Sequence, residues 1–286
     1  MQKQIQFENQ QDVSGEVLDK YERLCEQFQS VSSLIVAFSG GVDSSLLAYA
    51  AHRELGEEML AITAASETYP TEELREAEQI ADQYDFRHRV VPTSELAIEG
   101  YSENSPDRCF LCRDGLFTML HEIAEAEGFS AIAYGENASD GAGMDYRPGQ
   151  AAAKKHDVLA PLDAADLDKD DVRQLSQALG LPNWDKPELA CLSSRFPYGT
   201  EITEDGLEMV EKAERFLREN GFRQVRVRHH GEVARIEVLP AKIDEFFDED
   251  LRERVVEHLQ EVGYTYVSVD LRGYKTGSMN EALDDE

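Results

Sequence analysis

The chain has 286 residues, which exceeds an average single domain and favours one larger and one smaller domain. It carries 58 acidic and 28 basic residues, a formal net charge of −30, which opposes non-specific attraction to nucleic acid. No apolar run is long enough to span a bilayer and no basic-then-apolar N-terminus marks a signal peptide, so we expect a soluble, cytoplasmic protein with no membrane partner. The acidic residues are scattered along the chain, and we interpret them as a solvated, halophilic-type surface.

Apolar runs alternate with helical patterns over the first two thirds of the chain. The predicted strands are 34–38, 59–64, 87–91 and 130–134, and the predicted helices after the N-terminal one are 43–55, 71–84, 114–127 and 168–179. This alternation predicts an α/β fold with a parallel sheet flanked by helices, in which ligands collect at the carboxyl ends of the strands. The polar segment 135–149 is predicted to be a long loop on that face.

After Gly199 the pattern changes. Helices are predicted over 203–220 and 251–262, and strands over 223–229, 233–239 and 265–271. This order predicts a smaller α+β domain over residues 200–286, following an α/β domain over residues 1–199.

A glycine turn joins the first predicted strand to the following helix. Two successive glycines let backbone amides approach a ligand, and the helix N-terminus adds the positive end of its dipole, so phosphate is the favoured ligand. The hydroxyls would donate to phosphate oxygens, and Asp43 would hold Mg²⁺. A capped glycine turn without a ligand is the structural alternative. The turn is Ser39, Gly40, Gly41, Val42, Asp43, Ser44 and Ser45.

The turn resembles the S-G-G-x-D-S pyrophosphate loop of the PP-loop ATPases, and further segments resemble the LarE family of ATP-dependent sulfur insertases. Those segments are 108–112, 145–149, 184–187 and 190–200. The resemblance implies that the chain uses ATP and Mg²⁺ to adenylate a pyridinium dicarboxylate mononucleotide and then installs sulfur for a nickel-pincer nucleotide. It also implies a homo-oligomer, and a smaller domain whose arginines close over the site.

Cys191 lies in a polar segment between two prolines, and Arg195 is close enough in sequence to stabilise its thiolate. That context suits a nucleophile, whereas an inert loop cysteine is the alternative. The resemblance makes Cys191 the sulfur donor, whose thiolate attacks the acyl adenylate.

Cys109 and Cys112 form a single C-x-x-C pair, too few ligands for a four-ligand site. Cys191 would be a third ligand, and some members of the family with three such cysteines are associated with a four-iron, four-sulfur cluster. Two reduced thiols on one helical turn are the alternative. The sulfur source therefore stays open between Cys191 itself and sulfide bound to a cluster.

Arg226 and Arg228 alternate along one predicted strand, so both guanidinium groups emerge on one face, where they could bind a substrate phosphate. Surface salt bridges are the alternative, and the resemblance favours the phosphate. Glu237 on the neighbouring strand is a candidate for a polar or acid-base role. Asp140 and Arg147, in the loop after the fourth strand, are candidate substrate contacts or loop stabilisers.

Two other functions use the same loop. A PP-loop enzyme that thiolates tRNA needs a basic or stacking surface, and none is visible in the sequence. A regulator that binds the nucleotide without cleaving it is the non-enzymatic alternative.

Overall fold

The computed structural model describes residues 13–141, 148–187 and 190–275. These residues form two compact units. The first unit comes from Met1–Ser66, Thr71–Thr93 and Cys109–Leu189, and the second from Glu67–Pro70, Ser94–Arg108 and Ala190–Glu286. The long segment of the second unit therefore begins at Ala190 rather than at residue 200, and the unit also includes two short segments that the sequence analysis placed in the first domain.

The first unit is a four-stranded parallel sheet in the order β3-β2-β1-β4. Its strands are β1 (Leu34–Ala37), β2 (Met59–Ala65), β3 (His88–Pro92) and β4 (Ala131–Tyr134). Its helices are α1 (Gly15–Phe28), α2 (Val42–Leu55), α3 (Thr71–Gln83), α4 (Arg108–Glu127), α5 (Pro148–Lys155), α6 (Pro161–Ala164) and α7 (Lys169–Ala178), with 3₁₀ turns at Gly56–Glu58 and Ala138–Gly141.

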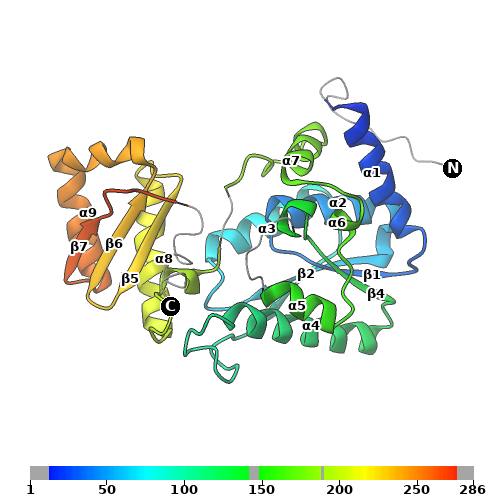
Figure 1. Ribbon diagram of the computed structural model, residues 1–286, viewed down its shortest axis with the longest axis horizontal. Helices are drawn as coiled ribbons and strands as arrows, with labels where there is room; N and C mark the ends of the chain where they lie inside the picture. The colour runs from blue at the N-terminus through cyan, green and yellow to red at the C-terminus, as the bar shows by residue number, and fades with distance from the viewer. Residues whose placement is uncertain (1–12, 142–147, 188–189, 276–286) are drawn as a thin grey trace. The chain divides into compact units, whose positions relative to one another are not determined.

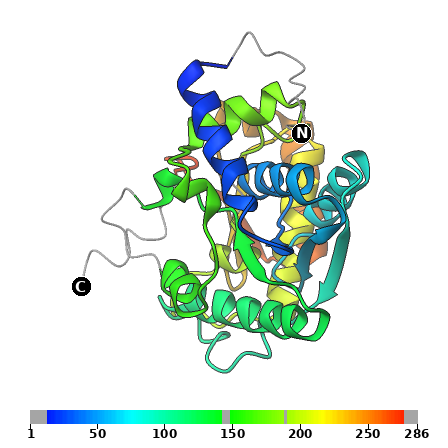
Figure 2. The same ribbon diagram turned by 90° about the vertical axis from the view of Figure 1, so that its right-hand side faces the viewer.

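The two faces of the sheet carry different helices. Leu34 and Val36 of β1 point into a core shared with α1, α2 and α7, whereas Ile35 points into a core shared with α4 and α5. Figure 1 shows α1, α2, α6 and α7 on one face and α4 and α5 on the other, and Figure 2 shows these two layers from a second direction. Because residues of a strand alternate between faces, the unbroken apolar run of β1 is what a sheet covered on both faces requires.

The strand order brings two loops together. The chain moves from β1 to β2 and β3 on one side and then returns to place β4 on the other side of β1. The reversal lies between β1 and β4, and ligands of such sheets bind beyond the carboxyl ends of the strands at that point. The segments after Ala37 and after Tyr134 leave the sheet there.

Several predicted elements differ from the structure. Helix α4 begins at Arg108 rather than at residue 114, so Cys109 and Cys112 lie among its first five residues. The predicted loop over 135–149 contains the turn Ala138–Gly141, and α5 begins at its end; residues 142–147 fall outside the described part of the chain.

The second unit is a three-stranded sheet in the order β5-β6-β7. Strands β5 (Val225–His230) and β6 (Val233–Val238) are antiparallel, and β7 (Tyr266–Val269) runs parallel to β6. Its helices are α8 (Glu204–Glu219) and α9 (Glu249–Val262), with 3₁₀ helices η4 (Leu192–Arg195) and η5 (Pro240–Phe247). One face of the sheet packs into its own core through Val225, Val227 and Ile236. The predicted α+β pattern is thus present. Among the described residues, none of the helices is both long and apolar enough to cross a membrane.

Candidate active site

The phosphate loop (Ser39–Ser45) joins β1 to α2. Gly40 has φ +61°, and a Cβ added there would lie 2.9 Å from the Cβ of Ala77, so both conformation and space favour glycine. Gly41 is the N-cap of α2 and provides no side-chain cap to the first N–H groups of this helix. A helix N-terminus without a side-chain acceptor is a favourable place for an anion.

The serines of the phosphate loop have two different environments. The Ser39 and Ser44 hydroxyls lie 3.1 Å apart, and the Ser39 amide donates to Ser44 Oγ at 3.2 Å. Ser45 is fully buried, and its hydroxyl accepts from Asn183 Nδ2 at 2.9 Å. Asn183 Nδ2 also donates to the carbonyl oxygen of Gly40 at 2.9 Å. Ser44 is also buried and its hydroxyl donates to the Gly41 carbonyl oxygen at 3.2 Å, so Ser44 and Ser45 both hold the loop, whereas Ser39 is exposed.

Asp43 lies in the first turn of α2 and is paired through both carboxylate oxygens. Lys169 Nζ lies 2.5 Å from Oδ2, and Asn137 Nδ2 donates to Oδ1 at 3.0 Å. Carboxylate oxygens are ligands that Mg²⁺ prefers, so metal binding by Asp43 stays a prediction. In the structure this carboxylate is held by a lysine and an asparagine that the sequence analysis did not identify.

The segment after β4 packs closely against the start of α2. A Cβ added at Gly135 would lie 2.7 Å from the Ser44 amide nitrogen, so glycine permits this approach. Asp140 Oδ2 accepts from the Asn137 amide at 3.3 Å, which supports its alternative role as a loop stabiliser. Arg147 lies outside the described residues.

The cysteines differ in exposure. Cys109 is exposed and Cys112 is half-buried near the start of α4, while Cys25 packs against the core, where burial raises its pKa to about 12. In the part of the chain that the structure describes, no three histidine, cysteine or acidic side chains are grouped so that they could hold a metal ion.

Cys191 is half-buried in the second unit and immediately precedes η4. Arg195 Nη1 donates to the carbonyl oxygens of Ala190 and Cys191, at 2.6 and 3.0 Å. Its Nε and Nη2 atoms bind Glu214 of α8 at 2.8 and 2.9 Å. Arg195 therefore holds the backbone at Cys191 through its two hydrogen bonds to carbonyl oxygens.

Glu214 is the acceptor at the centre of this arrangement. It also accepts from Arg218 at 2.6 Å and from the Val227 amide at 3.0 Å. Burial opposes its ionisation, but the charge and hydrogen bonds of Arg195, together with Arg218 and Arg226, outweigh burial and lower the pKa of Glu214 to about 2. The carboxylate is therefore ionised in the folded protein.

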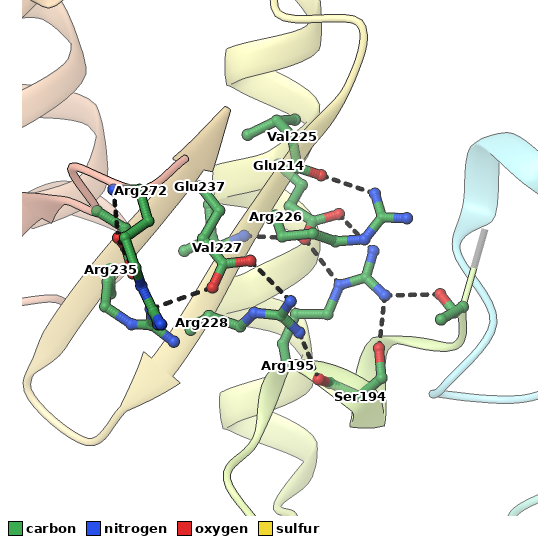
Figure 3. Close-up of polar contacts among 12 residues, drawn as sticks. Ser194, Arg195, Glu214, Val225, Arg226, Val227, Arg228, Arg235, Glu237 and Arg272 are labelled. Carbon is green, nitrogen blue, oxygen red and sulfur yellow. Dashed lines mark hydrogen bonds and ion pairs between the residues drawn. The ribbon is translucent and has the colours of Figure 1, made fainter. Parts of the chain in front are cut away.

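Arg226, Arg228 and Glu237 lie on the sheet face opposite the apolar core of the second unit (Figure 3). Arg228 binds Glu237 at 2.7 Å and the Ser194 carbonyl oxygen at 2.8 Å. Arg226 and Arg228 are only 4% and 7% exposed, so the alternative of ordinary surface salt bridges does not describe them. Burial and the charge of Arg195 lower the pKa of Arg226 to about 10.

We call this assembly the arginine network. It comprises Arg195, Arg218, Arg226, Arg228, Arg235, Arg272, Glu214, Glu237 and Asp270. These contacts join η4, α8, β5 and β6 within the second unit.

Sequence reasoning missed Glu214 although a signal was present. Leu207, Val210, Glu214 and Leu217 follow the spacing of one helix face, and the three apolar members are buried. A carboxylate in an apolar stripe indicates a buried partner. Lys169, Asn137 and Asn183 carried no comparable signal, because each sits in a polar segment and meets the phosphate loop from far along the chain.

Comparisons with known proteins identify what the chain as a whole is similar to. A family model described as asparagine synthase matches residues 24–107. An uncharacterised protein of Synechocystis is 42% identical over 264 residues, covering 92% of this chain and 98% of the relative. Argininosuccinate synthase of Natronomonas pharaonis is 29% identical over 188 residues, covering 60% of this chain and 46% of that protein.

The pyridinium-3,5-bisthiocarboxylic acid mononucleotide synthase of Lactiplantibacillus plantarum is 37% identical over 261 residues, which cover 91% of this chain and 93% of the synthase. The resemblance seen in the sequence is therefore confirmed over nearly the whole of both chains. The chain belongs to the LarE family of ATP-dependent sulfurtransferases, within the PP-loop superfamily.

Proposed function

We propose that the chain adenylates a carboxylate of a pyridinium dicarboxylate mononucleotide and converts it to a thiocarboxylate for nickel-pincer nucleotide biosynthesis. The name of the L. plantarum relative describes a pyridinium mononucleotide that bears two thiocarboxylates. The observation that carries the proposal is the phosphate loop at the reversal between β1 and β4, with Asp43 at the start of α2.

The first unit would perform the activation. The N-terminal amides of α2 and the hydroxyls of Ser39 and Ser44 would bind the phosphates of ATP, and Asp43 would hold Mg²⁺. A carboxylate oxygen of the substrate bonds to the α-phosphorus, the bond between that phosphorus and the bridging oxygen breaks, and pyrophosphate leaves. The product of this step is an acyl adenylate, which a sulfur nucleophile can attack.

The second unit would bind the mononucleotide through Arg226 and Arg228, with Glu237 holding Arg228. Guanidinium groups bind phosphate oxygens in pairs, so two of them on one face of β5 support an anionic ligand there. Because both guanidinium groups are buried, a phosphate must join or replace contacts such as that from Arg228 to the Ser194 carbonyl oxygen. Asp140 and Arg147 remain proposed substrate contacts.

Cys191 is the proposed centre of sulfur transfer, and Arg195 positions its backbone. We propose that Cys109, Cys112 and Cys191 hold a four-iron, four-sulfur cluster, because three thiolates leave one iron position that the protein does not fill. Such a cluster would supply inorganic sulfide as the nucleophile. The competing route uses the Cys191 thiolate itself, which displaces AMP to form a thioester and then loses its sulfur by cleavage of the Cβ–Sγ bond.

The test combines ATP, Mg²⁺ and the pyridinium dicarboxylate mononucleotide with the protein and follows both pyrophosphate release and the mass of the pyridinium product. We expect pyrophosphate release that depends on the substrate, and a product in which sulfur replaces oxygen. A pyridinium mononucleotide with an amide in place of the carboxylates is the control and should release none. Release with tRNA instead would favour a tRNA-thiolating enzyme, and no release with any acceptor would favour a nucleotide-binding regulator.

A further inference from the structure

Two side chains from the segment between β3 and α4 hold the backbone that follows Cys191. Arg108, the first residue of α4, is only 3% exposed, and its Nη1 donates to the Ser193 carbonyl oxygen at 3.0 Å. The same nitrogen donates to Oδ1 of Asn104, four residues earlier in the chain. All of these contacts lie within the second unit.

Asn104 adds three contacts of its own to this backbone. It is fully buried with φ +55°, a left-handed conformation that asparagine adopts more readily than most residues. Its Nδ2 donates to the carbonyl oxygens of Phe196 and Pro197, at 3.2 and 2.7 Å. Its own carbonyl oxygen accepts from the Gly199 amide at 3.1 Å. One asparagine therefore holds three residues of this segment, and its Oδ1 orients Arg108.

The segment after Cys191 cannot hold this conformation by itself. The 3₁₀ helix η4 has only four residues, too few to be stable through its own hydrogen bonds. Ser193 and Phe196 are fully buried, so their carbonyl groups need donors from the protein. Arg108 and Asn104 supply these donors from a distant part of the sequence.

The thiol of Cys191 thus lies on a backbone that is held on both sides. Arg195 binds the carbonyl oxygens of Ala190 and Cys191, and the pair Arg108 and Asn104 holds the residues that follow. A nucleophile must be placed about 3–3.5 Å from the carbon that it attacks, and an error of about 1 Å costs on the order of 100-fold in rate. Contacts that fix this backbone therefore affect the rate of attack.

We propose that Arg108 and Asn104 are positioning residues for sulfur transfer, which keep Cys191 in the orientation that the reaction needs. The inference rests on the proposed function, in which Cys191 is the centre of that transfer. Without the pair, the first unit would still form the acyl adenylate, but sulfur transfer would be slow. Water would then attack the activated carboxyl carbon, the bond from this carbon to the AMP oxygen would break, and AMP and the original carboxylate would form.

The test uses the full chain with ATP, Mg²⁺ and the pyridinium dicarboxylate mononucleotide, and it measures thiocarboxylate formed per pyrophosphate released in the first turnover. In Arg108→Met we expect unchanged pyrophosphate release and a ratio about 10- to 100-fold lower, because the backbone after Cys191 loses a charge-assisted hydrogen bond. Arg108→Lys keeps a cationic donor but not the planar guanidinium, so its ratio should lie between those of Arg108→Met and the wild type.

A double-mutant cycle tests whether the two residues act together. Asn104→Gly removes the side chain but still permits the left-handed backbone, and it should also lower the ratio. Because Arg108 and Asn104 share a contact, the double variant should lose less than the product of the two single effects.

Amide hydrogen exchange without substrate separates positioning from a loss of the fold. Exchange over residues 192–199 should be about 10- to 100-fold faster in Arg108→Met, which is the effect of one hydrogen bond from a charged group on local opening. Exchange in α8 should not change. Arg23→Met is the matched control: Arg23 of α1 donates to the Ala165 carbonyl oxygen at 3.1 Å in the first unit, and this variant should keep the wild-type ratio and exchange.

A wild-type ratio in a folded Arg108→Met, or unchanged exchange over residues 192–199, would overturn the inference. Equally faster exchange in α8 would overturn it too, because Arg108 would then only stabilise the fold. If the wild type releases pyrophosphate but forms no thiocarboxylate, the proposed function fails whatever the exchange shows. If the wild type and Arg108→Met form thiocarboxylate equally well, only the inference fails.

Discussion

Arg195 and Glu214 form a two-pronged ion pair in the interior of the second unit, with Nε to Oε1 at 2.8 Å and Nη2 to Oε2 at 2.9 Å. Neither side chain has exposed surface. The remaining nitrogen of the guanidinium binds the carbonyl oxygens of Ala190 and Cys191. The position of the Cys191 backbone therefore depends on a glutamate from another helix.

Glu214→Gln should lower the free energy of unfolding by about 3–5 kcal/mol, because it leaves buried guanidinium groups without their counter-charge. Urea unfolding measures the loss. Glu208→Gln is the control: it lies on the same helix in an exposed pair with Lys212 and should cost roughly 0.3–0.5 kcal/mol. Equal losses in the two variants would contradict the importance of the buried pair.

The stabilisation that Glu214 provides should depend on pH. The pKa of Glu214 falls to about 2 in the folded protein, whereas an unperturbed glutamate has a pKa of about 4.3. A lowered carboxyl pKa stabilises the fold above the unfolded pKa, and this stabilisation is lost as the pH falls through the folded pKa. The difference in the free energy of unfolding between wild type and Glu214→Gln should therefore stay constant from about pH 5 to about pH 8. It should become smaller as the pH falls below about 5, because Glu214 is then protonated in the unfolded chain and, at still lower pH, in the folded protein.

Asp43→Ala should abolish pyrophosphate release and leave the fold intact. The side chain lies at the partly exposed start of α2, so its removal takes away a metal ligand and the partner of Lys169 rather than a core group. Pyrophosphate release is measured with ATP and the mononucleotide, and thermal unfolding serves as the check on folding. Wild-type release would contradict the assignment.

The sequence was informative wherever local chemistry decides structure. The apolar run at Leu34–Ala37, the two glycines and the helical pattern that follows led to β1, the phosphate loop and α2 almost to the residue. The start of α4 was placed at residue 114, whereas the helix begins six residues earlier, at Arg108. Helix α6 has only four residues, too few for a periodic pattern.

The residues of the candidate site also fall into those that the local sequence reveals and those that it does not. The PP-loop residues form one continuous motif and were found directly, whereas the partner of Asp43 comes from Lys169 and that of Arg195 from Glu214. Such pairs are set by how elements pack, and nothing in the local sequence of Lys169 distinguishes it from a solvated lysine.

Arg228→Ala should weaken binding of the phosphorylated pyridinium substrate far more than binding of ATP, because the proposed contact is to the substrate phosphate. In this variant the Glu237 carboxylate would still be paired with Arg235, at 3.1 Å, so the loss of Arg228 does not leave a buried carboxylate without a counter-charge. Calorimetry with each ligand measures the two affinities. Arg254→Ala, at an exposed arginine on α9 of the same unit, is the control. Equal losses for both ligands would place Arg228 outside the substrate site.

High salt should stabilise the protein if the acidic composition reflects adaptation to it. With a net charge of −30, carboxylates repel one another in dilute buffer, and molar salt screens this repulsion to within about 3 Å. We expect thermal unfolding at a higher temperature in molar salt than in dilute buffer. If cooperative unfolding is no easier in dilute buffer than in molar salt, the interpretation of the acidic surface as halophilic is wrong.

The source of the sulfur is decided by what happens to Cys191. If it is consumed, its thioester breaks between Cβ and Sγ as the α-proton leaves, so Cys191 becomes dehydroalanine, the chain loses the mass of hydrogen sulfide, and each molecule turns over once. If three cysteines hold a cluster, they survive turnover as ligands, and the number of turnovers follows the supply of inorganic sulfide. The two routes therefore differ in the mass of the chain after reaction.

We expect the cluster route. Anaerobic purification should give a brown, iron-containing protein, and replacing Cys109, Cys112 or Cys191 by alanine should bleach it, whereas Cys25→Ala, at a thiol packed against the core, should keep the colour. Intact-mass measurement after turnover should find no loss. A colourless, iron-free anaerobic preparation whose Cys191 becomes dehydroalanine after a single turnover would establish consumption instead. Cys191 is indispensable to both routes, so full sulfur insertion by Cys191→Ala would exclude the two together.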